Sequence, residues 1–199
     1  MDKNLILNKK NLDEFELLNE DYLVESKYYD LPSGEQEYKL YSYITTQFDD
    51  ITILDIGTHL GTSAISLSHN EKNKVISFDI VDHIKDSNHK IYQKKNIEFK
   101  IENVLDYLNE ENIENIKIVL IDINHMGYKE TLILKKLISL KFSGIVILDD
   151  IHHPNKLINL QMKKLWNNIN LPKYDLTKYG HFSGTGLVLI NYDLNIIEE

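Results

Sequence analysis

Apolar residues follow two different rhythms along this chain. From residue 51 onwards, short runs rich in Ile and Val alternate with longer segments in which apolar positions recur every three or four residues. The first rhythm predicts buried strands and the second predicts helices. Strands are predicted at residues 51–57, 74–80, 97–101, 116–122, 144–150, 174–179 and 184–192. Helices are predicted at 61–70, between 80 and about 95, from about 104, at 127–142 and at 155–169.

Strands that alternate with amphipathic helices indicate right-handed crossovers and a parallel sheet covered on both faces. The fold class is therefore α/β: a Rossmann-like, seven-stranded, mostly parallel sheet with helices on both faces. We expect the last two strands to form a closing antiparallel pair. In sheets of this kind, ligands bind beyond the carboxyl ends of the strands.

Residues 1–50 are predicted to be a helical lead-in that packs on the core as a lid, and residues 51–199 to be the main body of a single domain. Ser33 and Gln36 have capping-box spacing, which predicts a helix starting at Ser33. Apolar residues then recur at helical spacing in this segment, at Leu40, Tyr41, Ile44 and Phe48. Tyr38 and Tyr41 could line a ligand pocket or simply cover the sheet.

Carboxylates stand where the predicted strands end, at Asp55, Asp79, Asp122, Asp149 and Asp150. Asp149 follows Asp122 by 27 residues, about one strand–helix–strand crossover. We therefore expect the three last-named acids to meet at one sheet edge. Oxygen ligands of this kind suit Mg²⁺ or a similar divalent ion, which would turn their mutual repulsion into attraction. The alternative is that Asp149 and Asp150 face solvent or cap the next helix.

His125 follows Asp122 by three residues and is the candidate general base, because imidazole accepts a proton near neutral pH. In this interpretation the catalytic residues are His125 and Asp122, and the metal ligands are Asp122, Asp149 and Asp150. His152 and His153 are expected to be ordinary loop residues. His181 is expected at the turn between the closing strands, near the substrate.

A glycine-containing turn, "LDIGTHLGTSA" (54–64), joins the first predicted strand of the sheet to a helix. Gly57 and Gly61 permit tight turning, and the helix start offers free amides. Asp79 follows Asp55 by 24 residues, a spacing at which an acid commonly accepts hydrogen bonds from ribose hydroxyls. The two features together favour an adenosine-bearing ligand. Taken singly, the turn could be a packing turn and Asp79 a helix cap.

This turn, with "ISFDI" (76–80), "IENVLDYL" (101–108) and "VLIDINH" (119–125), resembles the class I S-adenosylmethionine-dependent methyltransferases in order and spacing over about residues 34–192. The resemblance implies that the glycine turn lies against the methionine part, that Asp79 holds the ribose and that Asn103 with Val104 flanks the adenine. The cofactor-binding residues that it implies are Asp55, Gly57, Thr58, Gly61, Ser63, Asp79, Asn103, Val104 and Asp122. Two departures are His59, where many members have glycine, and Asn103, where aspartate is more frequent.

The acidic cluster resembles that of the metal-dependent O-methyltransferases. In those enzymes, an aspartate ending the fourth strand and an Asp–Asp or Asp–Asn pair ending the fifth bind the ion, and Asp122, Asp149 and Asp150 match those positions. At the position of His125, catechol-type members carry lysine and sugar-modifying members carry histidine. The resemblance therefore implies methyl transfer to a hydroxyl of a small molecule, with a sugar favoured as acceptor.

The amino-acid composition excludes some chemistry and argues against some binding partners. The 199 residues include no cysteine, which excludes thiolate chemistry, and no arginine, so the planar fork that grips phosphates is missing. The net charge of -9 argues against binding to nucleic acid or anionic membranes. The chain has neither a signal-peptide pattern nor an apolar run of the ~20 residues that cross a membrane. We expect a cytoplasmic protein; a homo-oligomer is compatible with the sequence, which leaves the oligomeric state open.

Three alternatives remain open at the level of sequence. The first is a metal-independent methyltransferase that acts on nitrogen. The second is a NAD-binding Rossmann oxidoreductase, although its GxGxxG turn would require glycine at residue 59, which is His59. The third is a binding module that keeps the cofactor pocket without turnover.

Overall fold

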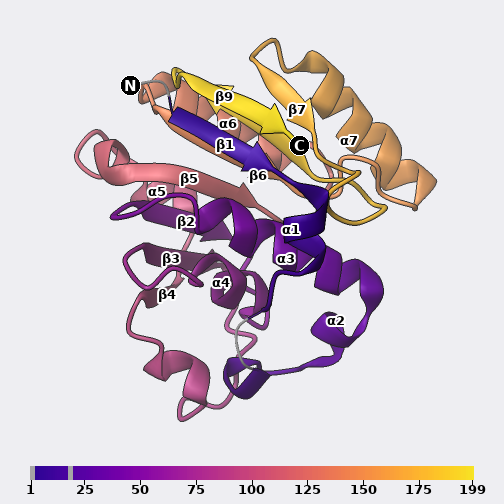
Figure 1. Ribbon diagram of the computed structural model, residues 1–199. Helices are drawn as coiled ribbons and strands as arrows, with labels where there is room; N and C mark the ends of the chain where they lie inside the picture. Colours follow the sequence, from indigo (N-terminus) through magenta and orange to yellow (C-terminus); the bar gives the residue numbers. More distant parts are fainter. Residues whose placement is uncertain (1–2, 18–19) are drawn as a thin grey trace.

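All seven predicted strands form one mixed sheet in the computed structural model, which describes residues 3–17 and 20–199 (Figure 1). The strands are β2 (Thr52–Ile56), β3 (Lys74–Asp79), β4 (Ile97–Ile101), β5 (Ile116–Ile121), β6 (Gly144–Leu148), β7 (Lys173–Asp175) and β8 (Gly186–Ile190). Their order is β4-β3-β2-β5-β6-β8-β7. The first five in this order are parallel, and β8 runs antiparallel to both β6 and β7. The predicted sheet and its closing antiparallel pair are confirmed.

Helices pack on both faces of this sheet. One face carries α3 (Pro32–Thr45) and α4 (Thr62–Leu67), whose buried side chains join those of β2 and β5 in one core cluster. The other face carries α5 (Val104–Tyr107), α6 (Tyr128–Ser139) and α7 (Lys156–Asn168), which share a second cluster. Two short helices, α1 (Lys9–Asp13) and α2 (Lys27–Asp30), precede α3.

The lead-in begins with a strand, in contrast to the helical segment that the sequence predicts. β1 (Lys3–Leu7) pairs in parallel with β9 (Leu194–Glu198), so segments near the two ends of the chain lie side by side (Figure 1). Within β1, exposed Asn4 and Ile6 alternate with buried Leu5 and Leu7. This period of two is the pattern of a half-buried strand, but it is too short to be recognised without its distant partner.

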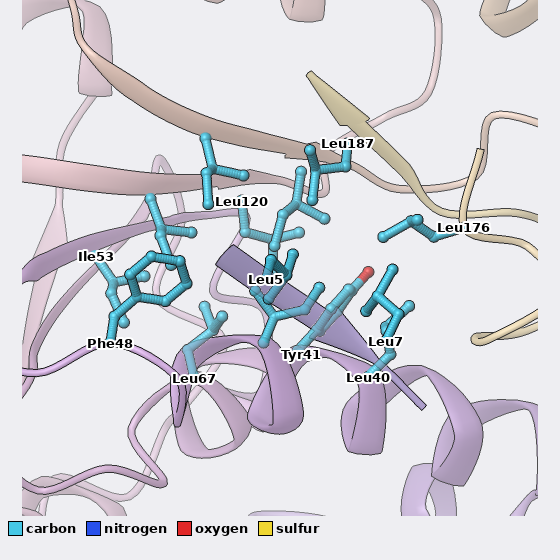
Figure 2. Close-up of a cluster of buried hydrophobic side chains, with 14 of the residues drawn as sticks. Leu5, Leu7, Leu40, Tyr41, Phe48, Ile53, Leu67, Leu120, Leu176 and Leu187 are labelled. Atoms are coloured by element: carbon cyan, nitrogen blue, oxygen red, sulfur yellow. The ribbon is translucent and has the colours of Figure 1, made fainter. Parts of the chain in front are cut away.

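Figure 2 shows how β1 joins the core: Leu5 and Leu7 point into the same cluster as Leu40 and Tyr41 of α3 and Leu120 of the sheet. These five side chains are at most 1% exposed. The lead-in therefore shares one hydrophobic cluster with the sheet.

Two other local predictions were wrong. The helix α3 begins at Pro32 with Leu31 as its N-cap, so Ser33 lies inside the first turn; proline suits this position because it has no N–H to leave unpaired. Between β3 and β4 the structure has a 3₁₀ turn, Lys90–Gln93, and no α-helix. Side chains there bond nearby backbone amides, for example Asp82 to Ile84 N and Asp86 to Asn88 N, and such bonds compete with helix formation.

Within the described part of the chain, no helix combines the length and the apolar character needed to cross a membrane.

The side chain of Gln47 pairs with β1 along the edge that β9 does not cover. Its Oε1 accepts from the amide of Ile6 at 2.8 Å, and its Nε2 donates to the carbonyl of Ile6 at 2.9 Å. We predict that Gln47→Ala lowers the free energy of unfolding by about 1–2 kcal/mol, the net value of two such bonds. Chemical denaturation measures this, with Gln36→Ala on the exposed surface of α3 as the control. A loss no larger than that of the control would contradict the role of Gln47.

Candidate functional site

A cavity of about 940 Å³ lies beyond the carboxyl ends of all five parallel strands, where the topology predicts a ligand. Each of these strands delivers one polar or glycine residue to its wall: Gly57 after β2, Asp79 at the end of β3, Asn103 after β4, Asp122 after β5 and Asp149 after β6. The predicted cofactor half and the predicted acidic half thus face one continuous space.

The glycine turn after β2 needs its glycines. Gly57 has φ +113°, and a Cβ there would lie 1.6 Å from the carbonyl oxygen of Asp122. Gly61 is the N-cap of α4 with φ +79°, and a Cβ there would lie 2.3 Å from Ile91 Cδ1. His59 between them also has a positive φ, +44°. Gly57 and Thr58 line the cavity, and Gly61 sets the start of the helix behind them.

The candidate adenosine side of the cavity is held in place by bonds from side chains to the backbone. Asp79 accepts from the amide of His59 at 2.9 Å and from the amide of Val81 at 3.1 Å, one on each carboxylate oxygen. Each oxygen keeps a further lone pair for a ligand hydroxyl. Asn103 caps α5 by accepting from its backbone at 3.1 Å, and buried Val104 lines the cavity beside it.

Asp55 lies behind the glycine turn and bonds to its surroundings, and it is not among the residues that line the cavity. It is fully buried, and its Oδ2 accepts from Ser63 Oγ at 3.1 Å and from Ser77 Oγ at 2.6 Å. Its Oδ1 has no hydrogen-bond partner among the described residues. Burial raises the pKa of Asp55 to about 6, against the lowering effect of the two serines. Ser63 reaches the cavity wall itself.

Asp122 and Asp149 come together because their strands are neighbours in register. Ile121 pairs with Leu148, and the amide of Asp149 donates to the carbonyl of Ile121 at 3.2 Å. Each aspartate continues the alternation of the strand before it, so both side chains point to the face covered by α3. One ligand atom each from Asp122, Asp149 and His125 lie within 4.8 Å of one another.

Asp150, the third predicted metal ligand, is placed differently. It has φ +58°, and it belongs to neither of the two groups of three close potential ligands found in the described residues. Its Oδ2 lies 3.5 Å from His125 Nε2 and 3.6 Å from His153 Nε2, and it lines the same cavity. The structure thus brings Asp122 and Asp149 together with His125, and sets Asp150 beside that histidine.

His125 sits among these carboxylates on a strained backbone, with φ +54°. Its Nε2 lies 3.5 Å from Asp122 Oδ1 and equally far from Asp150 Oδ2. Its Nδ1 is buried without a hydrogen-bond partner among the described residues. The ring stacks on His153 with centroids 5.9 Å apart, which brings one of the two loop histidines into the site. The other, His152, lies 2.6 Å from Asp175.

A second group, which sequence reasoning missed, shares Asp149. One ligand atom each from Glu37, Asp149 and His181 lie within 4.8 Å of one another, and all three residues line the cavity. Tyr41 Oη lies 3.0 Å from Asp149 Oδ1 and 2.9 Å from Glu37 Oε1, and His181 Nε2 lies 3.0 Å from Asp149 Oδ1. The sequence left open whether Tyr41 lines a pocket or covers the sheet, and it gave no signal for Glu37. Tyr38 lines the cavity next to them.

The carboxylates of the two groups differ in how readily they ionise. Burial alone raises the pKa of Asp149, but the hydrogen bond and the charge of His181, together with Tyr41, lower it overall. Burial, and then the charge of Asp149, raise the pKa of Asp122, of Asp150 and of Glu37. Asp149 is therefore the anionic centre, and its neighbours would ionise readily only if a cation joined them.

Comparison with solved structures places the fold. The chain is similar to cofactor-bound Rv0187 from MTB, at 14% identity with a TM-score of 0.60 over 78% of this chain and 79% of that one. It is also similar to a proposed caffeoyl-CoA O-methyltransferase from Staphylococcus aureus, at 16% identity and TM-score 0.58 over 77% and 82%. A third is fibrillarin from Aeropyrum pernix with natively bound S-adenosyl-L-methionine, at 13% identity and TM-score 0.50 over 71% and 67%.

No protein-family model matches the sequence, and no curated protein matches it significantly. The chain has the Rossmann-like fold of solved S-adenosylmethionine-dependent methyltransferases.

The buried Asp55 makes stability depend on pH. Its pKa is about 6 in the folded state and about 3.9 in an unfolded chain. Because the folded value is the higher one, the stabilisation from its proton is complete below about pH 4 and is lost as the pH rises through 6. In Asp55→Asn this loss is absent. We predict that the free energy of unfolding of the variant, relative to the unchanged protein, rises by about 1 kcal/mol from pH 5 to pH 8.

Urea denaturation at the two pH values measures this difference. Asp193→Asn, which alters an exposed aspartate, serves as the control and should show a constant difference. A constant difference for Asp55→Asn as well would mean that Asp55 does not carry the raised pKa.

Proposed function

We propose that this protein is an S-adenosylmethionine-dependent methyltransferase that moves a methyl group to a hydroxyl of a small molecule, with help from a divalent cation. The observation that carries the proposal is the joint placement of Asp122, Asp149 and His125 in the cavity wall that also contains the glycine turn and Asp79. An acceptor hydroxyl and a cofactor could lie next to each other there.

The residues on the cofactor side fit S-adenosylmethionine. Gly57 lines the cavity without a side chain, and Asp79 has lone pairs free for ribose hydroxyls. The acidic end would attract the positively charged sulfonium. When bound, S-adenosylmethionine supplies a methyl group on that sulfonium. The bound cofactor in the fibrillarin of similar fold supports this assignment.

The acidic end fits a divalent ion such as Mg²⁺. Its oxygen donors are the carboxylates of Asp122 and Asp149, which lie with the imidazole of His125 within 4.8 Å of one another, and a third carboxylate, Asp150, lies next to that imidazole. Oxygen donors of this kind are what Mg²⁺ and Mn²⁺ prefer. When bound, such an ion supplies Lewis acidity that makes a hydroxyl easier to deprotonate. Asp122 and Asp149 would hold it, and Asp150 lines the same cavity.

His125 is the residue placed to move the proton. Its Nε2 faces the acidic group, and the carboxylates of Asp122 and Asp150, each 3.5 Å away, would stabilise the imidazolium that forms when it accepts the hydroxyl proton. With S-adenosylmethionine bound, the deprotonated acceptor oxygen could take the methyl group, and S-adenosylhomocysteine would be the leaving group. The chain contributes orientation and proton transfer, and both act within one cavity.

A sugar or another aliphatic hydroxyl compound is the favoured acceptor. The support is His125 at the position where sugar-modifying O-methyltransferases carry histidine, together with a wall rich in hydrogen-bonding groups. Among the described residues that line the cavity, Lys129 is the only lysine, against six carboxylates. That balance favours a neutral acceptor over one rich in phosphate.

Ligand-induced stabilisation tests the cofactor assignment. We predict that S-adenosylhomocysteine raises the melting temperature of the protein by several degrees when it greatly exceeds its dissociation constant, and that NAD does not. Differential scanning fluorimetry with the two ligands at equal concentration measures this. Stabilisation by NAD without stabilisation by S-adenosylhomocysteine would point to an oxidoreductase and end the proposal.

Asp149→Ala tests the acidic half. We predict that this variant loses turnover and binds Mn²⁺ at least 10-fold more weakly, while its affinity for S-adenosylhomocysteine changes by less than about twofold. Titration calorimetry measures both affinities. Asp193→Ala is the matched control, because Asp193 is an exposed aspartate near the amino ends of the parallel strands, away from the cavity. Full activity of Asp149→Ala, or of the unchanged protein in excess chelator, would favour a metal-independent methyltransferase.

A further inference from the structure

Asp149 is held from outside its own strand by two donors. Its Oδ1 lies 3.0 Å from Tyr41 Oη and 3.0 Å from His181 Nε2. Tyr41 comes from α3 in the lead-in, and His181 comes from the loop between β7 and β8. All three residues are buried, at 5% exposure or less. In such surroundings hydrogen bonds are strong and geometrically strict, so these two contacts fix the rotation of the carboxylate.

The two donors leave one side of Asp149 for a ligand. Two hydrogen bonds occupy the two lone pairs of Oδ1. Within residues 3–17 and 20–199, no hydrogen bond reaches Oδ2, and Asp149 lines the cavity beside Asp122 and His125. The carboxylate is therefore oriented before anything binds, with one oxygen anchored and the other available.

We propose that Tyr41 and His181 are positioning residues: they hold Asp149 as an oriented, negatively charged ligand and thereby set the affinity of the site for a divalent cation, without touching the cation themselves. This inference rests on the proposed function, because it assumes that Asp149 binds the ion. It adds that the lead-in helix α3 takes part in building the ion site, as well as covering the sheet.

Glu37 extends the network by one member. A phenol has one proton, so Tyr41 cannot donate to Glu37 and to Asp149 at the same time. Tyr41 Oη lies 2.9 Å from Glu37 Oε1 and 3.0 Å from Asp149 Oδ1, so a donor at residue 37 would leave the tyrosine proton for Asp149. A glutamine at residue 37 could donate in the same way through its amide.

The rival interpretation is direct ligation, in which Glu37, Asp149 and His181 themselves surround an ion. His181 Nε2 is the atom that contacts Asp149 Oδ1 at 3.0 Å, so it would have to exchange that hydrogen bond for a metal bond. The two interpretations differ in what conservative replacements do. A positioning residue can be replaced by another donor, whereas an imidazole ligand cannot be replaced by a carboxamide without loss.

Mn²⁺ binding separates the positioning role from direct ligation. It is measured on the protein saturated with S-adenosylhomocysteine. Electron paramagnetic resonance of free Mn²⁺ gives the dissociation constant directly, without an acceptor. We expect Tyr41→Phe and His181→Leu to weaken Mn²⁺ binding by about 10-fold or more, the usual effect of removing a partner of a metal ligand. We expect His181→Gln and Glu37→Gln, which keep a donor, to stay within about threefold of the unchanged protein.

The control is Tyr43→Phe, which removes a hydroxyl from the same helix at a position with no hydrogen bond from that hydroxyl among the described residues. Affinity for S-adenosylhomocysteine, measured on every variant, shows that the fold and the cofactor site persist. Unchanged Mn²⁺ binding in Tyr41→Phe and His181→Leu would overturn the positioning role. A loss in His181→Gln or Glu37→Gln as large as in His181→Leu would overturn it in favour of direct ligation.

Binding measurements on the unchanged protein distinguish a failure of the proposed function from a failure of the positioning inference. If it binds S-adenosylhomocysteine but no Mn²⁺, the divalent-ion part of the proposed function fails, and the positioning inference falls with it. If it binds both and the variants bind Mn²⁺ equally well, only the positioning inference fails.

Discussion

Repulsion between two carboxylates on adjacent strands is the constraint around which this protein is built. Asp122 and Asp149 follow neighbouring parallel strands in register, so their side chains emerge on the same face of the sheet. Burial makes the repulsion stronger, since little water screens it. Hydrogen-bond donors lower the pKa of Asp149, whereas burial and the charge of Asp149 raise the pKa of Asp122. The arrangement is costly for an empty pocket and favourable for one that receives positive charge.

The two halves of the cavity are parts of one construction. The backbone carbonyl of Asp122 lies where a side chain on Gly57 would have to go, while the carboxylate of Asp122 joins the acidic group. The end of β5 therefore shapes the glycine turn and contributes to the candidate ion site at the same time. A methyl donor and an acceptor held on these two walls would be neighbours because the strands β2 and β5 are neighbours.

The chain ends contribute to the same place. Tyr41 reaches Asp149 from α3, and α3 shares one hydrophobic cluster with the sheet and with Leu5 and Leu7 of β1 (Figure 2). A core tyrosine with 0% exposure thus carries a polar contact at the cavity wall. This double role follows from the shape of the side chain, which is an apolar ring with a hydroxyl at its tip.

The sequence by itself determined the sheet, because long apolar runs separated by amphipathic helices leave few other topologies. It also predicted that Asp79, Asp122 and Asp149 would all lie at the carboxyl ends of the strands, since parallel strands end on the same side of the sheet, and all three line the cavity there. It did not determine β1, whose five residues are meaningful only beside β9, or the loop before Gln93, where side chains compete for the backbone amides. Only the tertiary structure decided that Asp150 stands beside His125 and outside the close group, and that Glu37, Tyr41 and His181 converge on Asp149. Tyr41 and Asp149 are 108 residues apart, and no local pattern encodes a contact that exists only after distant elements have packed.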